Sequence, residues 1–72
     1  MIVTYTTLDT YLGWREELVV GSDGRCAFSG IPVSREWAAW SLRQVRTLRR
    51  TYPGRFVTTR ERAPEGEGQD DA

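Results

Sequence analysis

The stretch SREWAAWSLRQVRTLRRTY, residues 34–52, decides the fold because it is the one long amphipathic segment in this chain of 72 residues. Ser34 suits the N-cap position, and Glu36 suits the first turn, where the helix dipole favours an acid. The pair Pro53-Gly54 ends the helix. At about 100° per residue, the apolar side chains gather in an arc about 140° wide. That arc contains Trp37, Ala38, Ser41, Leu42, Val45, Leu48 and Tyr52. The pattern therefore predicts a helix that lays one face on a partner layer.

Alternating, β-branched and aromatic stretches lie on both sides of this segment. They predict strands over residues 2–8, 12–20 and 25–29 before the helix, and over 55–62 after it. The run Gly-Ser-Asp-Gly at 21–24 is a strong turn signal between the second and third strands. Glu16 interrupts the inward-facing pattern of its strand, which indicates a bulge or an exposed strand end. Pro32 cannot donate to a sheet, so we expect the third strand to stop before it.

Together these elements predict an α+β fold with the order β-β-β-α-β in a single domain, residues 1–62. A three-stranded antiparallel meander is covered by the helix, and a fourth strand follows at an edge that the pattern does not specify. The expected core consists of Trp14, Phe28, Trp37, Val45 and Leu48. Residues 63–72, APEGEGQDDA, are predicted to be a disordered acidic tail.

The formal net charge of zero hides a strong segregation of charge along the chain. Residues 34–62 carry eight arginines against two glutamates, whereas the residues before and after this part carry net charges of minus two and minus four. After Glu36 the helix contains no acid that could pair with its arginines at i+4. The arginines therefore require an anionic surface elsewhere: acids of the sheet, the tail, a partner protein or phosphates.

Trp40 is the most informative side chain of the helix because it falls about 60° outside the apolar arc. One interpretation lays its indole against the edge of the sheet with the nitrogen in water. The other makes it an exposed binding anchor, since binding surfaces concentrate their energy in Trp, Tyr and Arg. The candidate partner-binding residues on this side of the helix are Trp40, Arg43, Arg46, Thr47 and Arg50.

Residues for catalysis or metal binding are scarce. The chain has no histidine and one cysteine, Cys26, which excludes the usual zinc spacings and a Cys-His pair. We expect Cys26 to be a small buried residue on a strand. Glu16 and Glu17 are neighbours on a strand and point to opposite faces, so they cannot converge on one substrate. We therefore expect no enzyme activity, no catalytic residues, no metal and no cofactor.

The leading hypothesis is a small non-catalytic protein-interaction module that binds a partner through the arginine-rich flank of its helix. Small accessory or inhibitory proteins of phages and other mobile elements have this character, although no motif here identifies one. The alternative is an RNA- or DNA-binding module that uses the same arginines with Trp40 and Tyr52. A homodimer stays open, because a core this small benefits from reinforcement. The sequence contains no membrane-spanning run, and we expect a cytoplasmic protein.

Overall fold

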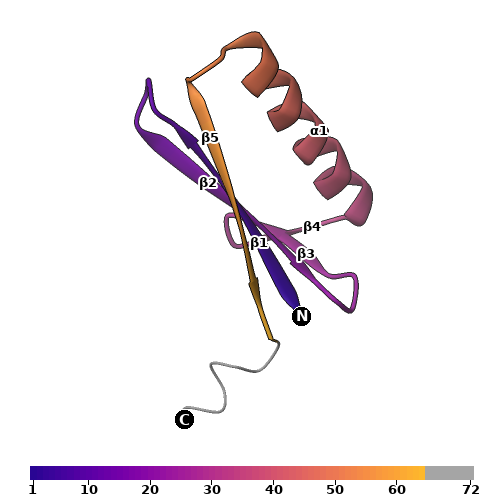
Figure 1. The fold of residues 1–72 in the computed structure, drawn as a ribbon. Helices are drawn as coiled ribbons and strands as arrows, with labels where there is room; N and C mark the ends of the chain where they lie inside the picture. Colours follow the sequence, from indigo (N-terminus) through magenta and orange to yellow (C-terminus); the bar gives the residue numbers. More distant parts are fainter. Residues whose placement is uncertain (65–72) are drawn as a thin grey trace.

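One helix lies across one face of a five-stranded antiparallel sheet in the computed structural model, which describes residues 1–64 (Figure 1). The predicted α+β class, with one helix packed on an antiparallel sheet, is confirmed. Within these residues the structure forms no helix long and apolar enough to cross a membrane. From residue 65 onward the predicted acidic tail lies outside the described residues. The strands are β1 (Ile2–Asp9), β2 (Trp14–Gly21), β3 (Cys26–Phe28), β4 (Ile31–Val33) and β5 (Phe56–Ala63), and the helix is α1 (Arg35–Thr51).

The strand after the helix, β5, lies at the edge of the sheet beside β1, a position that the sequence pattern did not specify. The sheet order is β4-β3-β2-β1-β5, so β5 pairs antiparallel with β1 in a register that runs from Ile2↔Ala63 to Asp9↔Phe56. β1 is therefore bonded along its length on both sides, and β5 on one side only. The two ends of the helix reach opposite parts of the sheet, because α1 starts after β4 and leads into β5 (Figure 1).

The third strand ends before Pro32, as expected, but the predicted order β-β-β-α-β lacks the short strand that follows it. Residues Ile31–Val33 form β4, in which Pro32 lies opposite Ala27 of β3. The neighbouring bonds from Ser29 N–H to the Glu17 carbonyl and from Gly21 N–H to the Arg25 carbonyl show that Ala27 directs its backbone groups to β2. Its partner Pro32 then directs its nitrogen away from the ladder. Because β4 is an edge strand, proline removes no hydrogen bond there.

The bulge considered at Glu16 is absent, because β1 and β2 pair without interruption from Ile2↔Gly21 to Asp9↔Trp14. Glu16 instead lies near the start of β2, beyond the point where β3 ends opposite Leu18. Its carboxylate is partly solvated at this open end, so an acid on the helix-facing side of the sheet is tolerated. Partial burial raises the pKa of Glu16 above its usual value.

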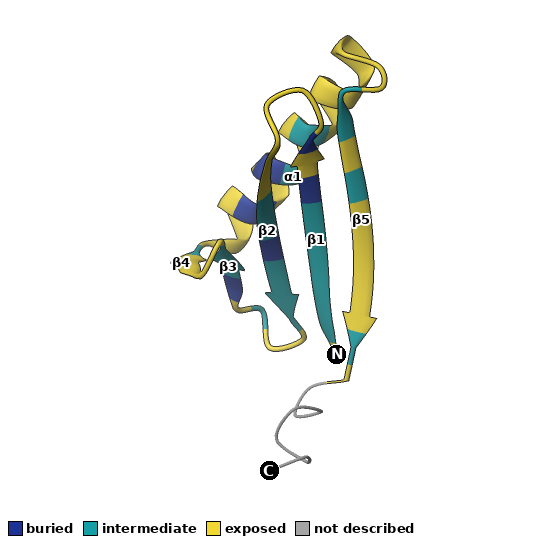
Figure 2. Cartoon of the chain, turned by 90° about the vertical axis from the view of Figure 1, so that its left-hand side faces the viewer, coloured by how far each residue is buried: buried dark blue, intermediate teal, exposed yellow. Residues whose placement is uncertain are grey.

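The core is smaller than expected and is built from small side chains. Its fully buried apolar residues are Leu18, Cys26 and Ala38, surrounded by the partly buried Tyr5, Val20, Phe28, Val33 and Leu42 (Figure 2). Of the expected core, Phe28 and Val45 are partly buried, whereas Trp14, Trp37 and Leu48 are exposed. Ala38 and Ser41 are the fully buried residues of α1, so the helix approaches the sheet most closely at small side chains, with Leu42 packed beside them. The larger side chains at the margins of the apolar arc, Trp37 and Leu48, lie at the flanks of the helix and are exposed.

The ends of α1 follow the sequence signals. Ser34 is the N-cap, and its hydroxyl accepts a hydrogen bond of 3.0 Å from the Trp37 N–H. At the other end, the Tyr52 N–H donates to the Leu48 carbonyl at 2.8 Å. Gly54 then takes a φ of 84°, a left-handed conformation that glycine adopts without strain. The predicted helix is confirmed.

Candidate functional site

Trp40 belongs to a row of three aromatic rings that leads from the sheet to the solvent. The rings of Phe28 and Trp37 meet edge to face with centroids 4.9 Å apart, and those of Trp37 and Trp40 lie 6.1 Å apart. Trp40 is 49% exposed and Trp37 is 37% exposed. The indole of Trp40 is therefore held from one side by another ring and presents its remaining surface to water.

The five candidate residues all lie on the solvent side of α1. Every one is exposed: Trp40, Arg43, Arg46, Thr47 and Arg50. The hydroxyl of Thr47 donates to the Arg43 carbonyl at 3.2 Å, one turn back along the helix. Thr47 thus has a bond within the helix, and the surface available to a partner consists mainly of the indole of Trp40 and three guanidinium groups.

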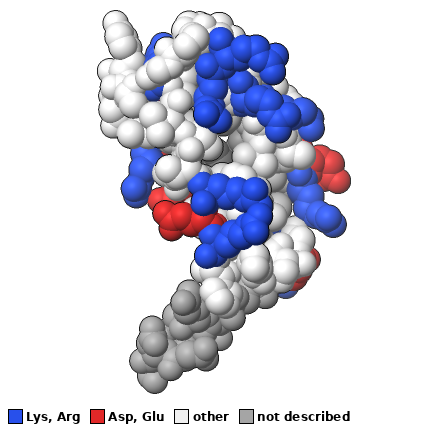
Figure 3. Space-filling model, in the orientation of Figure 1, with Lys and Arg blue, Asp and Glu red and all other residues white. Residues whose placement is uncertain are grey.

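The arginines of this surface have no acidic partner among residues 1–64. The ion pairs within this part of the molecule join Arg15 to Glu17, Arg25 to Asp23 and Arg55 to Asp9, none of which involves α1. Glu17, one of the sheet acids that we considered as a partner for the helix, is thus paired with Arg15 instead. Figure 3 shows blue basic groups spread over the face formed by the helix and β5, with few red acidic ones among them.

Two further arginines of this face were missed from the sequence. Arg60 and Arg62 lie on β5 and share the helix-facing side of the sheet with Tyr5 and Val3 through the register of β1 and β5. The guanidinium carbon of Arg60 lies 6.0 Å from the centre of the Tyr5 ring. Alternation in the sequence groups these two arginines on one side of their strand. It does not reveal that the strand would lie at the edge beside β1.

Trp40 and Tyr52, which the nucleic-acid alternative combines, are not brought together. Twelve residues of helix separate them by about 18 Å along the axis. Tyr52 is also engaged within the fold, because the guanidinium of Arg55 lies 5.5 Å from its ring centre and the ring of Phe56 lies 6.3 Å away. The two rings therefore do not form a common platform for one base.

A partly buried ion pair joins the enclosed carboxylate of Asp9 to Arg55, whose side chain is 30% exposed, and the sequence reasoning missed it. Arg55 donates to both carboxylate oxygens of Asp9, from Nε at 3.1 Å and from Nη2 at 3.0 Å. Asp9, only 1% exposed, also accepts the backbone N–H groups of Tyr11 and Leu12 at 2.9 and 3.1 Å. The guanidinium hydrogen bonds, together with these backbone bonds, hold the pKa of Asp9 below its usual value.

This pair joins two turns, and the only signal for it in the sequence is an acid after one strand and an arginine before another. The guanidinium of Arg55 is flanked by three aromatic rings and already bonds both carboxylate oxygens of Asp9. Its carbon lies between 5.1 and 5.5 Å from the ring centres of Tyr11, Tyr52 and Phe56. We therefore assign the pair a structural role.

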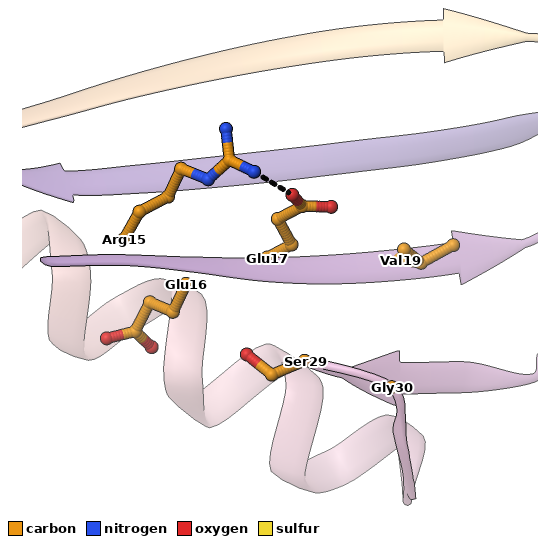
Figure 4. A pocket seen from close by; sticks show the side chains of 6 residues that line it. All are labelled: Arg15, Glu16, Glu17, Val19, Ser29 and Gly30. Atoms are coloured by element: carbon orange, nitrogen blue, oxygen red, sulfur yellow. Dashed lines mark ion pairs between the residues drawn. The ribbon is translucent and has the colours of Figure 1, made fainter.

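A shallow depression of about 340 Å³ lies at the open part of β2, where β3 has ended (Figure 4). Arg15 and Glu17 project to one side of the sheet and form an ion pair of 3.1 Å, whereas Glu16 projects to the helix side. The expectation that the two glutamates point to opposite faces is confirmed. The described residues contain no group of three or more histidine, cysteine or acidic side chains able to hold a metal ion.

Cys26 lies in the core and its thiol is near the Gly24 carbonyl, with sulfur and oxygen 3.7 Å apart. The expectation of a small buried residue on a strand is confirmed. The most distinctive surface of the described chain is therefore the exposed indole of Trp40 beside arginines that lack acidic partners. Comparison with protein-family models, with curated proteins and with solved structures found no match to this chain.

Proposed function

We propose that this chain is a small non-catalytic protein-interaction module that binds an acidic partner surface through the solvent side of α1. The observation that carries the proposal is the half-exposed indole of Trp40, held against Trp37 and adjoining arginines without acidic partners. An aromatic anchor that is already ordered loses little conformational entropy on binding. Arginines around it supply charge-assisted hydrogen bonds to carboxylates.

The proposal includes a biological setting: an accessory or inhibitory protein of a phage or other mobile element, acting in the cytoplasm. Small size and a charge-segregated surface support such a role, in which the protein occupies the surface of a larger partner. Self-association into a homodimer remains part of the prediction. Sedimentation equilibrium over a wide concentration range tests it, and a constant monomer mass would remove it.

Affinity capture with matched variants tests the binding surface. Trp40→Ala should lose the partner that the wild-type protein captures, with affinity reduced at least about tenfold, as for an interface hot spot. Trp14→Ala is the control, because Trp14 is 42% exposed and belongs to β2, outside the row of rings that holds Trp40. Replacing Arg43 and Arg46 with glutamine should weaken capture, whereas Arg25→Gln, at an exposed arginine in the hairpin turn, should not.

Circular dichroism and urea unfolding of the same variants complete this test. Trp40→Ala should remain folded and lose about 1 kcal/mol, the contribution of one aromatic pair. A variant that unfolds would show that Trp40 stabilises the fold and is no free anchor. Capture that is unchanged in both Trp40→Ala and the double arginine variant would refute this surface.

The second candidate is an RNA- or DNA-binding module that uses the same arginines with Trp40 and Tyr52. The observation in its favour is the absence of acidic partners for the helix arginines among the described residues. The separation of the two rings and the contact of Arg55 with Tyr52 favour the protein partner. Titration of labelled single- and double-stranded nucleic acid at low and moderate salt separates the two, because phosphate binding must weaken steeply with salt.

A further inference from the structure

The two edges of the sheet differ sharply in how they are protected. One edge is β4, which has three residues and carries Pro32 in its centre, so it offers little to a further strand. The other edge is β5, which has eight residues, pairs only with β1 and contains no proline or glycine. Figure 1 shows β5 at the front of the sheet, with no other described segment in front of it. This long edge is available for pairing.

The direction of the free backbone groups on β5 follows from a single bond. The Thr10 N–H donates to the Arg55 carbonyl at 2.9 Å, and this pair continues the register of β1 with β5. Because backbone groups of successive residues in a strand point to alternate sides, Val57, Thr59 and Glu61 direct theirs to β1. The residues between them direct their N–H and C=O groups outward, and no described residue bonds them: Phe56, Thr58, Arg60 and Arg62.

The charge along this edge is basic on the helix-facing side. Arg60 and Arg62 both lie there, two residues apart, and neither has an acid within ion-pair distance among residues 1–64. Glu61 lies between them and faces the opposite side of the sheet. Figure 3 views this edge from the front and shows further basic groups of the helix beside it. An additional strand would therefore meet positive charge on one side only.

We propose that the open edge of β5 binds an extended acidic peptide of a partner protein as a sixth, antiparallel strand. Two acidic residues, spaced two apart, lie opposite Arg60 and Arg62 and face the helix side. The residue between them lies beside Glu61 and is not acidic. Backbone hydrogen bonds to β5 give affinity, and the paired charges give specificity. This surface is distinct from the solvent side of α1 and does not depend on the function proposed for it.

A second copy of this chain fits the same edge less well. Two β5 strands side by side would bring together two basic faces, each within a segment of net charge plus six. Like charges repel across such an interface, and an acidic peptide has the opposite effect. The charge of the edge therefore favours a foreign acidic strand over self-pairing.

The probe for this proposal is a nine-residue peptide of alternating threonine and valine with two glutamates two residues apart. Isothermal titration of the full chain at low salt should show binding. A peptide of the same composition with adjacent glutamates is the control, because adjacent side chains point to opposite faces of a strand. It should bind about tenfold more weakly, and a version with glutamines should bind more weakly still. Equal binding of the adjacent-glutamate peptide would show unspecific charge attraction and overturn the proposal.

Blocking hydrogen bonds tests strand pairing directly. Methylation of the amide nitrogens of the two glutamates, which face β5 in this register, should abolish binding. Methylation of the residue between them should be tolerated, because its amide points away. Equal effects of the two modifications would contradict an added strand. This comparison uses the unaltered protein, so it does not depend on the folding of any variant.

Protein variants give an independent check. Thr58→Pro removes an outward N–H and leaves the bonds to β1 in place, so it should weaken binding at least about tenfold. Thr58→Val is its control and should bind as the wild type does. Sedimentation of the same proteins identifies the occupant. A dimer that forms without peptide and is lost in Thr58→Pro would assign the edge to a second copy and overturn the peptide proposal.

Discussion

The side chain of Asp9 connects two turns that are 46 residues apart in the chain. It closes the turn after β1 through the Tyr11 and Leu12 amides and accepts two bonds from Arg55, which precedes β5. A buried carboxylate is tolerated only where its oxygens are bonded and its charge is matched, and both conditions are met here. Removal of one partner leaves the other charge uncompensated, so this pair is sensitive to substitution.

Asp9→Asn should lower the free energy of unfolding at neutral pH, because Arg55 loses its counter-charge. The effect should be larger than that of Asp23→Asn, whose exposed carboxylate pairs with Arg25. Urea unfolding as a function of pH measures it. The folded-state pKa of Asp9 lies below its usual value, so its ionised form stabilises the protein above the pKa of the unfolded chain, and this contribution is lost as the pH falls through the folded-state pKa. The variant should lack this part of the acid-induced loss; an unchanged pH profile would contradict the assignment.

Thr58 presents the opposite situation, a polar group that is buried without a partner. Its hydroxyl oxygen is inaccessible to solvent and makes no hydrogen bond in the structure. Thr58→Val keeps the shape of the side chain and removes the unsatisfied group, so it should raise the free energy of unfolding by about 1 kcal/mol. Thr59→Val is the matched control, since Thr59 is exposed on the other face of the same strand. If both substitutions gave the same gain, strand propensity rather than burial would explain it.

At the scale of elements, α1 carries its own start and stop signals. The N-cap bond from the Trp37 N–H to Ser34 and the left-handed Gly54 after the last turn both depend on residues within or adjoining the helix. This is why the helix was predictable almost to its ends. The strands depend on pairing instead, and short ones such as β4 form only because β3 supplies a neighbour.

Ser34→Ala should destabilise the protein by about 1 kcal/mol, the usual effect of losing an N-cap acceptor. Thermal and urea unfolding measure the change. Ser34→Asp is the control, because aspartate can accept the same bond and favours the positive end of the helix dipole. We expect it to match or exceed the wild-type stability. An alanine variant as stable as the wild type would show that packing of Ala38 and its neighbours alone fixes the start of the helix.

The whole molecule has two layers, a helix and a sheet, and the sheet face away from the helix is uncovered among the described residues (Figure 2). Leu8 and Val57 lie opposite each other on that face, and both are exposed. The core has few fully buried side chains, and five partly buried apolar residues packed against it supply further apolar burial. A small domain of this kind buries a modest share of its surface.

Amide hydrogen exchange measured by NMR tests this arrangement across the molecule. Amides of β1 should be the most protected, because β1 is bonded on both sides. Along β5, protection should alternate: Thr59 and Glu61 exchange slowly, whereas Thr58, Arg60 and Arg62 exchange quickly. Uniform protection along β5 would show that another strand already covers this edge and would contradict an open one.

Local sequence determined the parts of this protein whose physics is local. The helix over 34–52, its caps, the alternating strands, the placement of Cys26 on a strand and the segregation of charge follow from periodicity, capping chemistry and composition. The α+β class follows from them, because an amphipathic helix and half-buried strands cover each other's apolar faces.

Tertiary structure alone decided which distant residues meet. It placed β5 beside β1, joined Asp9 to Arg55, added Arg60 and Arg62 to the basic face, and left Trp14 and Trp37 at the surface. These outcomes depend on strand order and on the close approach of α1 to the sheet through Ala38 and Ser41. Pairing partners far apart in the chain leave no periodic signal in either segment, so sequence determined the elements, and packing determined which of their side chains became surface.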